Sequence, residues 1–371
     1  MRLSGGEQLA DLIDRHSGRL FVMPAILIIL AFSIFPLIIS AWLALSRFRL
    51  AAGGYDVRFV WFLNFRKLLI GSEQYHFLGT AAPKTTAGWI AIALSAFLIT
   101  RAVITYARSG KVTVIGVFGR TLAFGLFGAL IWMLASTIGQ GGQLGSLGTT
   151  LFYVGCGLGV QFTIGTGLAW LCAQRIRGRS FFRVVFFIPM MVTPVGIAYS
   201  FRMLADMTAG PFAPIWQMFG LGTFQWATNP WSARLIVMLG ESWQWIPFIF
   251  IVMLAAFESQ PREEVEAAEL DGASTFRVFR DITWPSVAPV AATVVLIRMI
   301  EAFKIIDLPN VLTNGGPGIS TESLTLHSFM LWRALDLGAS AAVAYMLLFV
   351  STVICVSFFN FIVEPMRSAR L

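Results

Sequence analysis

The sequence has few charged residues and few cysteines, and both shortages exclude classes of protein. Only 12% of its 371 residues are Asp, Glu, Lys or Arg, whereas 57% are hydrophobic and the mean hydropathy is +0.76. Soluble domains have about a quarter charged residues, and a soluble chain of this length would expose too much apolar surface to water. The three cysteines all lie within apolar stretches and provide no disulfide framework. The composition therefore predicts a membrane protein.

Histidine is equally scarce, and the sequence shows no pattern typical of catalysis. The three histidines, His16, His76 and His327, are scattered, and no nucleophile and base lie near one another. The Gly-x-x-x-x-Gly-Lys-Ser/Thr motif that cradles nucleotide phosphates does not occur anywhere. We therefore predict no catalytic residue, no metal site and no cofactor on this chain, and we do not expect the chain itself to hydrolyse ATP.

Long apolar stretches are what the sequence has in abundance. Eight of them reach about 20 mostly apolar residues, the length that crosses a bilayer as a helix. In lipid a backbone must satisfy its own hydrogen bonds, and the alternating pattern of barrel strands is not seen, so we expect an all-α, polytopic protein. The predicted spans are 20–45, 87–106, 114–138, 149–172, 184–204, 233–257, 287–306 and 340–363.

The basic residues lie between the apolar runs rather than in one patch. The net charge of +8 therefore does not indicate nucleic-acid binding. Lys and Arg concentrate on the cytoplasmic side of membrane proteins, and the compact basic segment 175–183 assigns its connection to that side. With an even number of spans, the segment 1–19 and the C-terminus are then also cytoplasmic. The loop 46–86, with several cations on the outer side, departs from this rule.

The connection between the sixth and seventh spans is long and acidic. Pro261 followed by glutamates predicts the start of a helix, and Gly272 predicts its end. A second short helix is expected over 273–281, with Pro285 breaking it before the seventh span. Such a helix–turn–helix at the membrane surface suits docking in the groove of a partner, although an amphipathic connector that rests on lipid headgroups is an alternative.

The spacing of this connection resembles the "EAA" motif of permease subunits in bacterial ABC importers. That motif runs Glu-Ala-Ala, three residues, Gly, nine residues, Ile, one residue and Leu-Pro, and here only Trp284 departs from it, in place of Leu. The resemblance implies that Glu266 and Gly272 couple the chain to an ATPase subunit. The residues of the predicted coupling site are Glu266, Ala267, Ala268, Gly272 and Pro285.

A wider resemblance links the chain to the larger permease of maltose-type carbohydrate importers. It includes Phe35-Pro36-Leu37, the Phe186-Phe187-Ile188-Pro189 segment, Phe303-Lys304 and the stretch from Leu312 to Gly318. It covers about 20–78 and 146–365 and leaves 79–145 unexplained. The implied fold is a six-helix type I importer core with an inserted pair of spans. The predicted parts are 1–19, a cytoplasmic segment; 20–78, the first core span and an external loop; 79–145, the inserted pair; and 146–371, the remaining core with the coupling loop 258–285.

The same resemblance implies function and partners. It implies one half of a pore that imports a carbohydrate or a derivative by alternating access across the bacterial inner membrane. A second permease subunit, two ATPase subunits that carry ATP and Mg, and an external, periplasmic solute-binding protein would complete the importer. Two alternatives are an ion-coupled secondary transporter, which would need internal repeats and no docking loop, and an integral membrane transferase.

Polar residues inside the sixth and seventh spans are the candidates for solute binding, since transporter sites lie near the midplane. Trp245 offers a face on which a sugar ring can stack, and an arginine at such a position suggests a solute with an anionic group. Alternatively, Arg298, Glu301 and Lys304 neutralise one another at i, i+3 spacing. The predicted solute-binding residues are Glu241, Gln244, Trp245, Arg298, Glu301 and Ala302.

Overall fold

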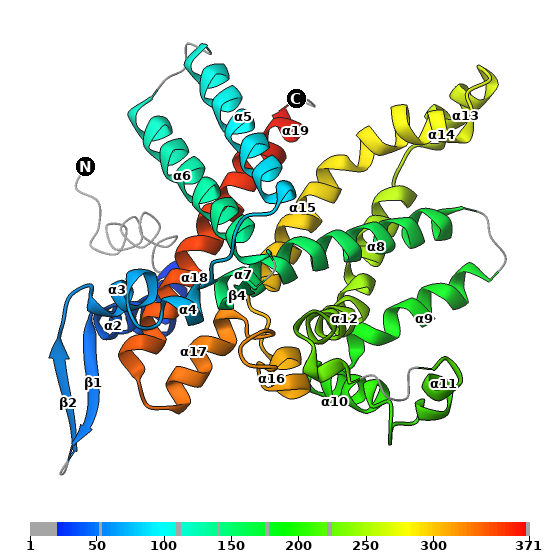
Figure 1. The fold of residues 1–371 in the computed structure, drawn as a ribbon. Helices are drawn as coiled ribbons and strands as arrows, with labels where there is room; N and C mark the ends of the chain where they lie inside the picture. Colours follow the sequence, from blue (N-terminus) through cyan, green and yellow to red (C-terminus); the bar gives the residue numbers. More distant parts are fainter. Residues whose placement is uncertain are drawn as a thin grey trace, which may run out of the picture.

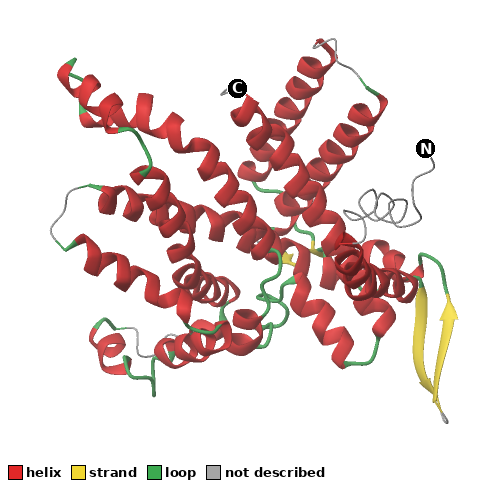
Figure 2. Ribbon diagram, turned by 180° about the vertical axis from the view of Figure 1, so that it is seen from behind, coloured by secondary structure: helices red, strands yellow, loops and turns green. Residues whose placement is uncertain are grey.

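The computed structural model describes residues 21–51, 54–108, 113–139, 141–174, 178–220 and 225–368. The predicted cytoplasmic segment 1–19, and residues 175–177 of the basic segment used for orientation, lie outside the described residues. Helices dominate the described part, which confirms the predicted all-α class, and Figure 2 shows strands only in one hairpin and one short ladder.

Seven helices in the described residues are long and apolar enough to cross a membrane. They coincide, to within a turn or so at most ends, with seven of the eight predicted spans, although the seventh span begins about three turns earlier than predicted. The seven are Phe21–Ala44, Thr86–Arg108, Gly116–Thr137, Ser146–Ala173, Pro230–Glu258, Thr275–Ala302 and Leu337–Met366.

The predicted span over 184–204 corresponds to two helices joined by a sharp bend. The structure forms α9 (Arg179–Met191) and α10 (Pro194–Ala205), which meet at an angle of 99°. Proline disfavours helical backbone at the residue before it, and Thr193, which precedes Pro194, is extended with ψ of 144°. The Thr193 side chain then caps α10 by accepting a hydrogen bond from the Gly196 N–H. The bent pair therefore has the form of a broken span or of a re-entrant loop.

Three helices form the centre of the bundle. These are α8 (Leu158–Ala173), α12 (Pro230–Glu258) and α15 (Trp284–Ala302), and their spans are the most buried. Gly165 lets α8 approach α12 closely, because a Cβ there would lie 2.9 Å from Cβ of Ile249. The helix over Phe21–Ala44, by contrast, buries none of its apolar window and leaves it for lipid or a partner.

The remaining elements surround this centre. The hairpin β1 (Ser46–Ala51) and β2 (Gly54–Phe59) is antiparallel, with Ser46 opposite Phe59. The Asn64 side chain ties its base to the first span by donating to the carbonyl oxygens of Ala44 and Ser46, at 2.8 and 2.9 Å. The other elements are η1 (Leu30–Ile34), α2 (Phe35–Ala44), α3 (Leu63–Ile70), α4 (Gln74–Phe77), α7 (Ser146–Phe152), η2 (Tyr153–Gly157), α11 (Ala213–Met218), η3 (Trp226–Thr228), α16 (Asp307–Thr313), α17 (Leu324–Arg333), α18 (Leu337–Phe358), η5 (Phe359–Val363) and α19 (Glu364–Ser368).

Two further spans, α5 (Thr86–Arg108) and α6 (Val114–Thr137), pack against each other, and α6 also contacts α18. Short strands flank the pair, β3 (Gly79–Thr80) before it and β4 (Gln143–Leu144) after it. They pair antiparallel, with Gly79 opposite Leu144 and Thr80 opposite Gln143. The chain therefore leaves for the helix pair and returns from it at a single place.

The connection between the sixth and seventh spans contains α13 (Arg262–Leu270), α14 (Thr275–Val278) and η4 (Phe279–Thr283). The prediction that Pro285 breaks the chain before the seventh span is wrong, since the span runs unbroken from Thr275 to Ala302. Proline is tolerated in the first turn of a helix, and Pro285 occupies that position in α15, directly after the π-helical turn η4. Figure 1 shows α13 and α14 at the far end of α15, on the same side of the molecule as α19.

The close contact at the β3–β4 ladder predicts a sensitivity to side-chain size. Gly79 has φ of +98°, and a Cβ there would lie 2.1 Å from the carbonyl oxygen of Gln143. We expect Gly79→Ala to lower the free energy of unfolding by about 1–3 kcal/mol, measured by thermal unfolding in detergent. Gly119→Ala is the matched control because no atom lies within 4 Å of its Cβ position in α6. Equal stability of the two variants would contradict this account of the ladder.

Candidate solute-binding and coupling sites

A buried polar cluster joins the three central helices. Arg298 of α15 donates from Nη2 to Oε1 of Glu241 on α12, at 2.6 Å, and from Nε to Oε1 of Gln161 on α8, at 2.8 Å. The Arg298 side chain is 1% exposed, and its guanidinium lies 4.4 Å from the ring centroid of Trp245. An arginine in an apolar bundle needs such partners, so the cluster fixes how the three helices meet.

Several polar atoms of this region have no hydrogen-bond partner among the described residues. They include Nη1 of Arg298, Nε2 of Gln161 and Oε1 of Gln244, all of them buried. Buried polar atoms in proteins are almost always paired with protein or with water. The cluster therefore holds donors and an acceptor that suit the hydroxyl groups of a polar solute, beside an aromatic face at Trp245.

The structure brings some predicted solute-binding residues together and separates others. Glu241, Trp245 and Arg298 lie in the cluster, and Gln244 is buried one turn after Glu241. Glu301 instead accepts from Nζ of Lys304, at 2.6 Å, where both side chains are more than a third exposed. Ala302 packs in the hydrophobic core.

The expected charge compensation within the seventh span is therefore only partly correct. Lys304 neutralises Glu301, but Arg298 pairs with Glu241 of another helix. Because that pair has no net charge, Arg298 does not offer the uncompensated positive charge that would favour an anionic solute. Sequence analysis missed Gln161, whose only signal is a polar amide within the long apolar run of the fourth span.

The predicted coupling residues gather on an exposed turn. Glu266 and Ala267 are exposed on α13, Ala268 is half-buried, and Gly272 follows the helix with φ of +79°. The N–H groups of Gly272 and Ala273 donate to the carbonyl oxygens of Glu269 and Ala268, both at 3.0 Å. These two bonds form the helix-ending motif that requires a left-handed residue, which explains the glycine. Pro285 lies apart from this turn, in the first turn of α15.

Two large apolar side chains are exposed on the same connection. Leu270 is 88% exposed and Phe276 is 71% exposed, although neighbouring positions are acidic or basic. Val278, which is buried, fixes the segment to the bundle. Exposed apolar side chains among charges are typical of a surface that a partner covers.

A second polar cluster lies outside the membrane-spanning helices. Nε2 of His76 lies 2.9 Å from Oε1 of Glu322, and the rings of His76 and His327 stack with centroids 3.9 Å apart. Nδ1 of His327 lies 2.9 Å from the Ser146 hydroxyl. Sequence analysis treated the histidines as scattered, whereas the fold brings two of them together. The three side chains of His76, Glu322 and His327 are of the types that bind divalent metals, with candidate ligand atoms within 4.8 Å of one another.

The pKa values of the two histidines in this cluster shift in opposite directions. Burial lowers the pKa of His76, but the hydrogen bond and charge of Glu322, with the charge of Glu73, outweigh it and raise this pKa above 6.5. Burial, with the neighbouring His76, lowers the pKa of His327 to about 3. His76 is therefore the ring that takes up a proton, and His327 stays neutral beside it.

Comparison with known proteins identifies a family profile that matches most of the chain after the helix pair. Residues 165–368 match the profile described as "Binding-protein-dependent transport system inner membrane component". This stretch contains α13, Gly272 and the residues Glu241 and Arg298, whereas Gln161 lies just before it.

Curated relatives match half of the chain or more. The trehalose/maltose transport system permease protein MalF of Thermococcus litoralis is 30% identical over 185 residues, which is 50% of this chain and 63% of that protein. The sn-glycerol-3-phosphate transport system permease protein UgpA of Yersinia pseudotuberculosis is 28% identical over 228 residues, 60% of this chain and 76% of that protein. The chain thus spans less than two thirds of the length of the first of these relatives.

A solved structure shares the fold. A chain of a bacterial alginate ABC transporter, crystallised in complex with an alginate pentasaccharide-bound periplasmic protein, superposes with a TM-score of 0.53. The similarity covers 73% of this chain and 96% of that chain, at 19% sequence identity.

The buried pair of Arg298 and Glu241 predicts a large effect on stability. Arg298→Met leaves a carboxylate in the apolar core without its cation, so we expect a loss of about 3–5 kcal/mol in the free energy of unfolding. Lys304→Met is the matched control because its pair with Glu301 is exposed, and its effect should be about 0–1 kcal/mol. Unfolding of both variants in detergent checks this, and the Glu241→Gln, Arg298→Met double variant should recover part of the loss. Similar losses for Arg298→Met and Lys304→Met would show that the pair is not buried.

The raised pKa of His76 predicts a pH-dependent contribution to stability. A raised folded-state pKa contributes stability that is fully present below pH 6.5 and is lost as the pH rises through the raised value. The difference in thermal midpoint between the wild type and His76→Gln should therefore be larger in mildly acidic than in alkaline buffer. A difference that does not change with pH would count against the His76–Glu322 ion pair.

Proposed function

Because the chain belongs to the family of binding-protein-dependent transport system inner membrane components, we propose that it is the permease subunit of an ATP-driven importer for a carbohydrate or carbohydrate derivative. The family match also confirms the resemblance to carbohydrate permeases that the sequence motifs indicate. The chain is a multi-pass membrane protein, and we place it in the bacterial inner membrane with both termini in the cytoplasm.

One observation carries the mechanical part of this proposal. The span from Thr275 to Ala302 is a continuous helix that begins next to the exposed turn at Gly272 and contains Arg298 near its other end. A push on α13 by a partner would therefore be transmitted along this helix to the buried cluster. Such a lever links the stroke of an ATPase to the solute path, as alternating access requires.

The chemistry of the buried cluster supports a neutral, polyhydroxylated solute. Trp245 offers a stacking face, Oε1 of Gln244 offers an acceptor, and Nη1 of Arg298 and Nε2 of Gln161 offer donors. The names of the relatives MalF and UgpA refer to trehalose and maltose and to sn-glycerol 3-phosphate. Because Glu241 already neutralises Arg298, we favour an uncharged sugar for this chain over a phosphate ester.

The proposed partners follow from surfaces of the chain. The sequence contains no phosphate-binding loop, so ATP and Mg would be carried by separate ATPase subunits. These subunits would cover the exposed side chains of Leu270 and Phe276. A second permease subunit would cover apolar surface such as that of Phe21–Ala44, and an external binding protein would deliver the solute. The core would consist of 20–78 and 146–371, with 79–145 as an addition. Neither an ion-coupled transporter nor a transferase is favoured by the family match.

Solute-stimulated ATP hydrolysis by the assembled complex tests the coupling role of Glu266. We expect Glu266→Ala to reduce the stimulated rate about tenfold, because a charge-assisted contact contributes about 1.5–3 kcal/mol. Glu264→Ala is the matched control, since it removes an equally exposed acid from the opposite face of α13. Transport of neutral sugars by the reconstituted complex tests the function itself. The proposal fails if the chain does not purify with an ATPase, or if Glu264→Ala and Glu266→Ala lower the rate equally.

A further inference from the structure

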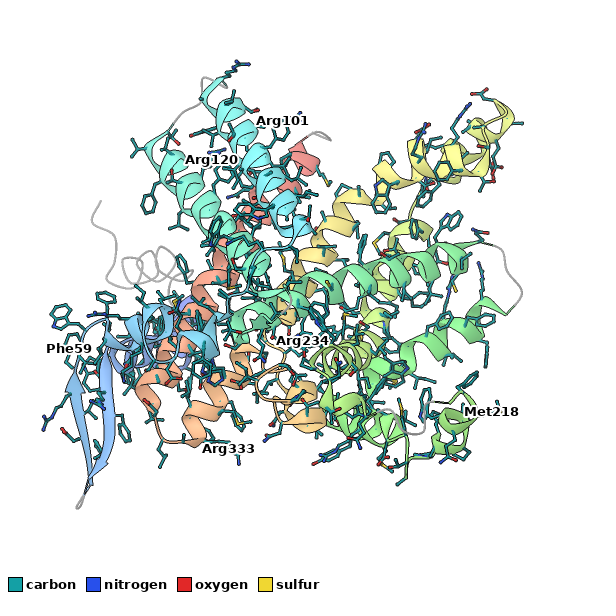
Figure 3. The ribbon with its side chains drawn as sticks, in the orientation of Figure 1. Phe59, Arg101, Arg120, Met218, Arg234 and Arg333 are labelled. Atoms are coloured by element: carbon teal, nitrogen blue, oxygen red, sulfur yellow. The ribbon has the colours of Figure 1, made fainter. Side chains whose placement is uncertain are left out.

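The helix pair α5–α6 contains a cavity that the proposed function does not use. The cavity has a volume of about 690 Å³, and its lining includes Arg101 in the C-terminal part of α5 and Arg120 in the N-terminal part of α6, both labelled in Figure 3. Its volume lies within the range of about 300–1,000 Å³ that is usual for small-molecule sites. Its lining residues are Leu98, Arg101, Ala102, Thr105, Tyr106, Thr113, Arg120 and Phe361.

Two arginines line the cavity, and no described residue of its lining is acidic. The sequence contains no Asp or Glu between Glu73 and Asp206, so neither helix can supply a carboxylate. Among the described residues, neither Arg101 nor Arg120 has a carboxylate oxygen within 4.0 Å, and every ion pair found there involves other cations. Two guanidinium groups thus face one cavity without an anionic partner in the described part of the chain.

The surroundings hold Arg120 in place without neutralising it. Its guanidinium lies 3.5 Å from the centroid of the Tyr106 ring, and it donates to the carbonyl oxygen of Gly116 at 3.3 Å. The Tyr106 hydroxyl accepts from the Thr113 N–H, at 3.0 Å, which fixes the ring against the first turn of α6. A Cβ at Gly116 would lie 2.4 Å from that hydroxyl, so the glycine permits this packing. The charge is therefore pre-positioned rather than mobile.

Both arginines lie at a depth where lipid phosphate is within reach. Arg101 precedes the end of α5 at Arg108 by seven residues, and Arg120 follows the start of α6 at Val114 by six. At 1.5 Å per residue, each lies about 10 Å inside its helix end. An arginine at this depth is costly unless its long side chain extends toward the headgroups or an anion meets it.

The opposite end of the same helix pair is built differently. There, Nζ of Lys84 lies 4.0 Å from the ring centroid of Trp132 and 5.5 Å from that of Trp89. The aromatic faces already stabilise that cation. The two ends are thus distinct: among the residues that the structure describes, the end with Arg101 and Arg120 combines two cations with a cavity, whereas Lys84 at the other end lies against aromatic rings.

We propose that this cavity binds the phosphate headgroup of an anionic phospholipid. Arg101 and Arg120 hold the phosphate, and the acyl chains extend past Leu98 and Phe361. Thr105, whose hydroxyl donates to the carbonyl oxygen of Arg101 at 2.9 Å, also lines the cavity. The apolar part of this lining distinguishes a lipid from free phosphate, which has no use for it. This gives the helix pair 79–145 a function that stands whether or not the chain is a sugar permease.

Lipid retention by the whole chain tests the site. The wild type, purified from nanodiscs of phosphatidylcholine mixed with phosphatidylglycerol, should keep bound phosphatidylglycerol in native mass spectrometry. Titration with phosphatidylglycerol should show about tenfold weaker binding for each of Arg101→Gln and Arg120→Gln. Arg108→Gln is the matched control, because Arg108 ends the same helix but does not line the cavity, and it should bind like the wild type.

Two further measurements test whether the variants fold and whether the ligand is a lipid. Thermal unfolding in phosphatidylcholine alone should be the same for all variants, which shows that they fold. Stabilisation by phosphatidylglycerol but not by inorganic phosphate identifies lipid as the ligand. The proposal is overturned if inorganic phosphate stabilises the wild type as well as the lipid does, or if the Arg101→Gln, Arg120→Gln double variant retains as much phosphatidylglycerol as the Arg108→Gln control.

Discussion

The buried guanidinium of Arg298 requires polar partners, and this requirement determines how the central helices pack. Arg298 is almost fully buried, and its partners Glu241 and Gln161 come from two other helices. An unpaired guanidinium in that place would destabilise the bundle strongly, so α8, α12 and α15 can meet only in the arrangement that pairs it. The same three helices are the most buried spans, and one of them continues to the exposed connection at Gly272. The packing of the three central helices and the buried polar cluster thus depend on one guanidinium group.

Much of this architecture follows from local patterns in the sequence. Seven spans match because about 20 apolar residues have few alternatives to a helix in lipid. The end of α13 follows from Gly272, because the hydrogen bonds that finish the helix need a residue with positive φ. Glu241 and Arg298 can be predicted because charged side chains inside a span are costly and are therefore rare unless they pair or bind a solute, and Trp245 lies one turn from Glu241 on the same helix face.

Other features depend on contacts between distant parts of the chain, which local patterns do not contain. Gln161 is a single amide within an apolar span, and its role as a partner of Arg298 follows only from the packing of α8 against α15. Likewise, His76 and His327 become neighbours only when α4 meets α17 beside Ser146. Two prolines have opposite effects on helix continuity, and the sequence pattern alone does not distinguish them. Pro194 ends a span that looks continuous, because it constrains Thr193, whereas Pro285 sits in a first turn where its missing N–H is tolerated.

The two-residue ladder between Gly79 and Leu144 brings the two ends of the intervening segment side by side. A segment held in this way can change in length or sequence without moving the flanking helices α4 and α7 apart, because the ladder fixes the distance between its ends. The rest of the molecule is thus insulated at this point from changes within the helix pair.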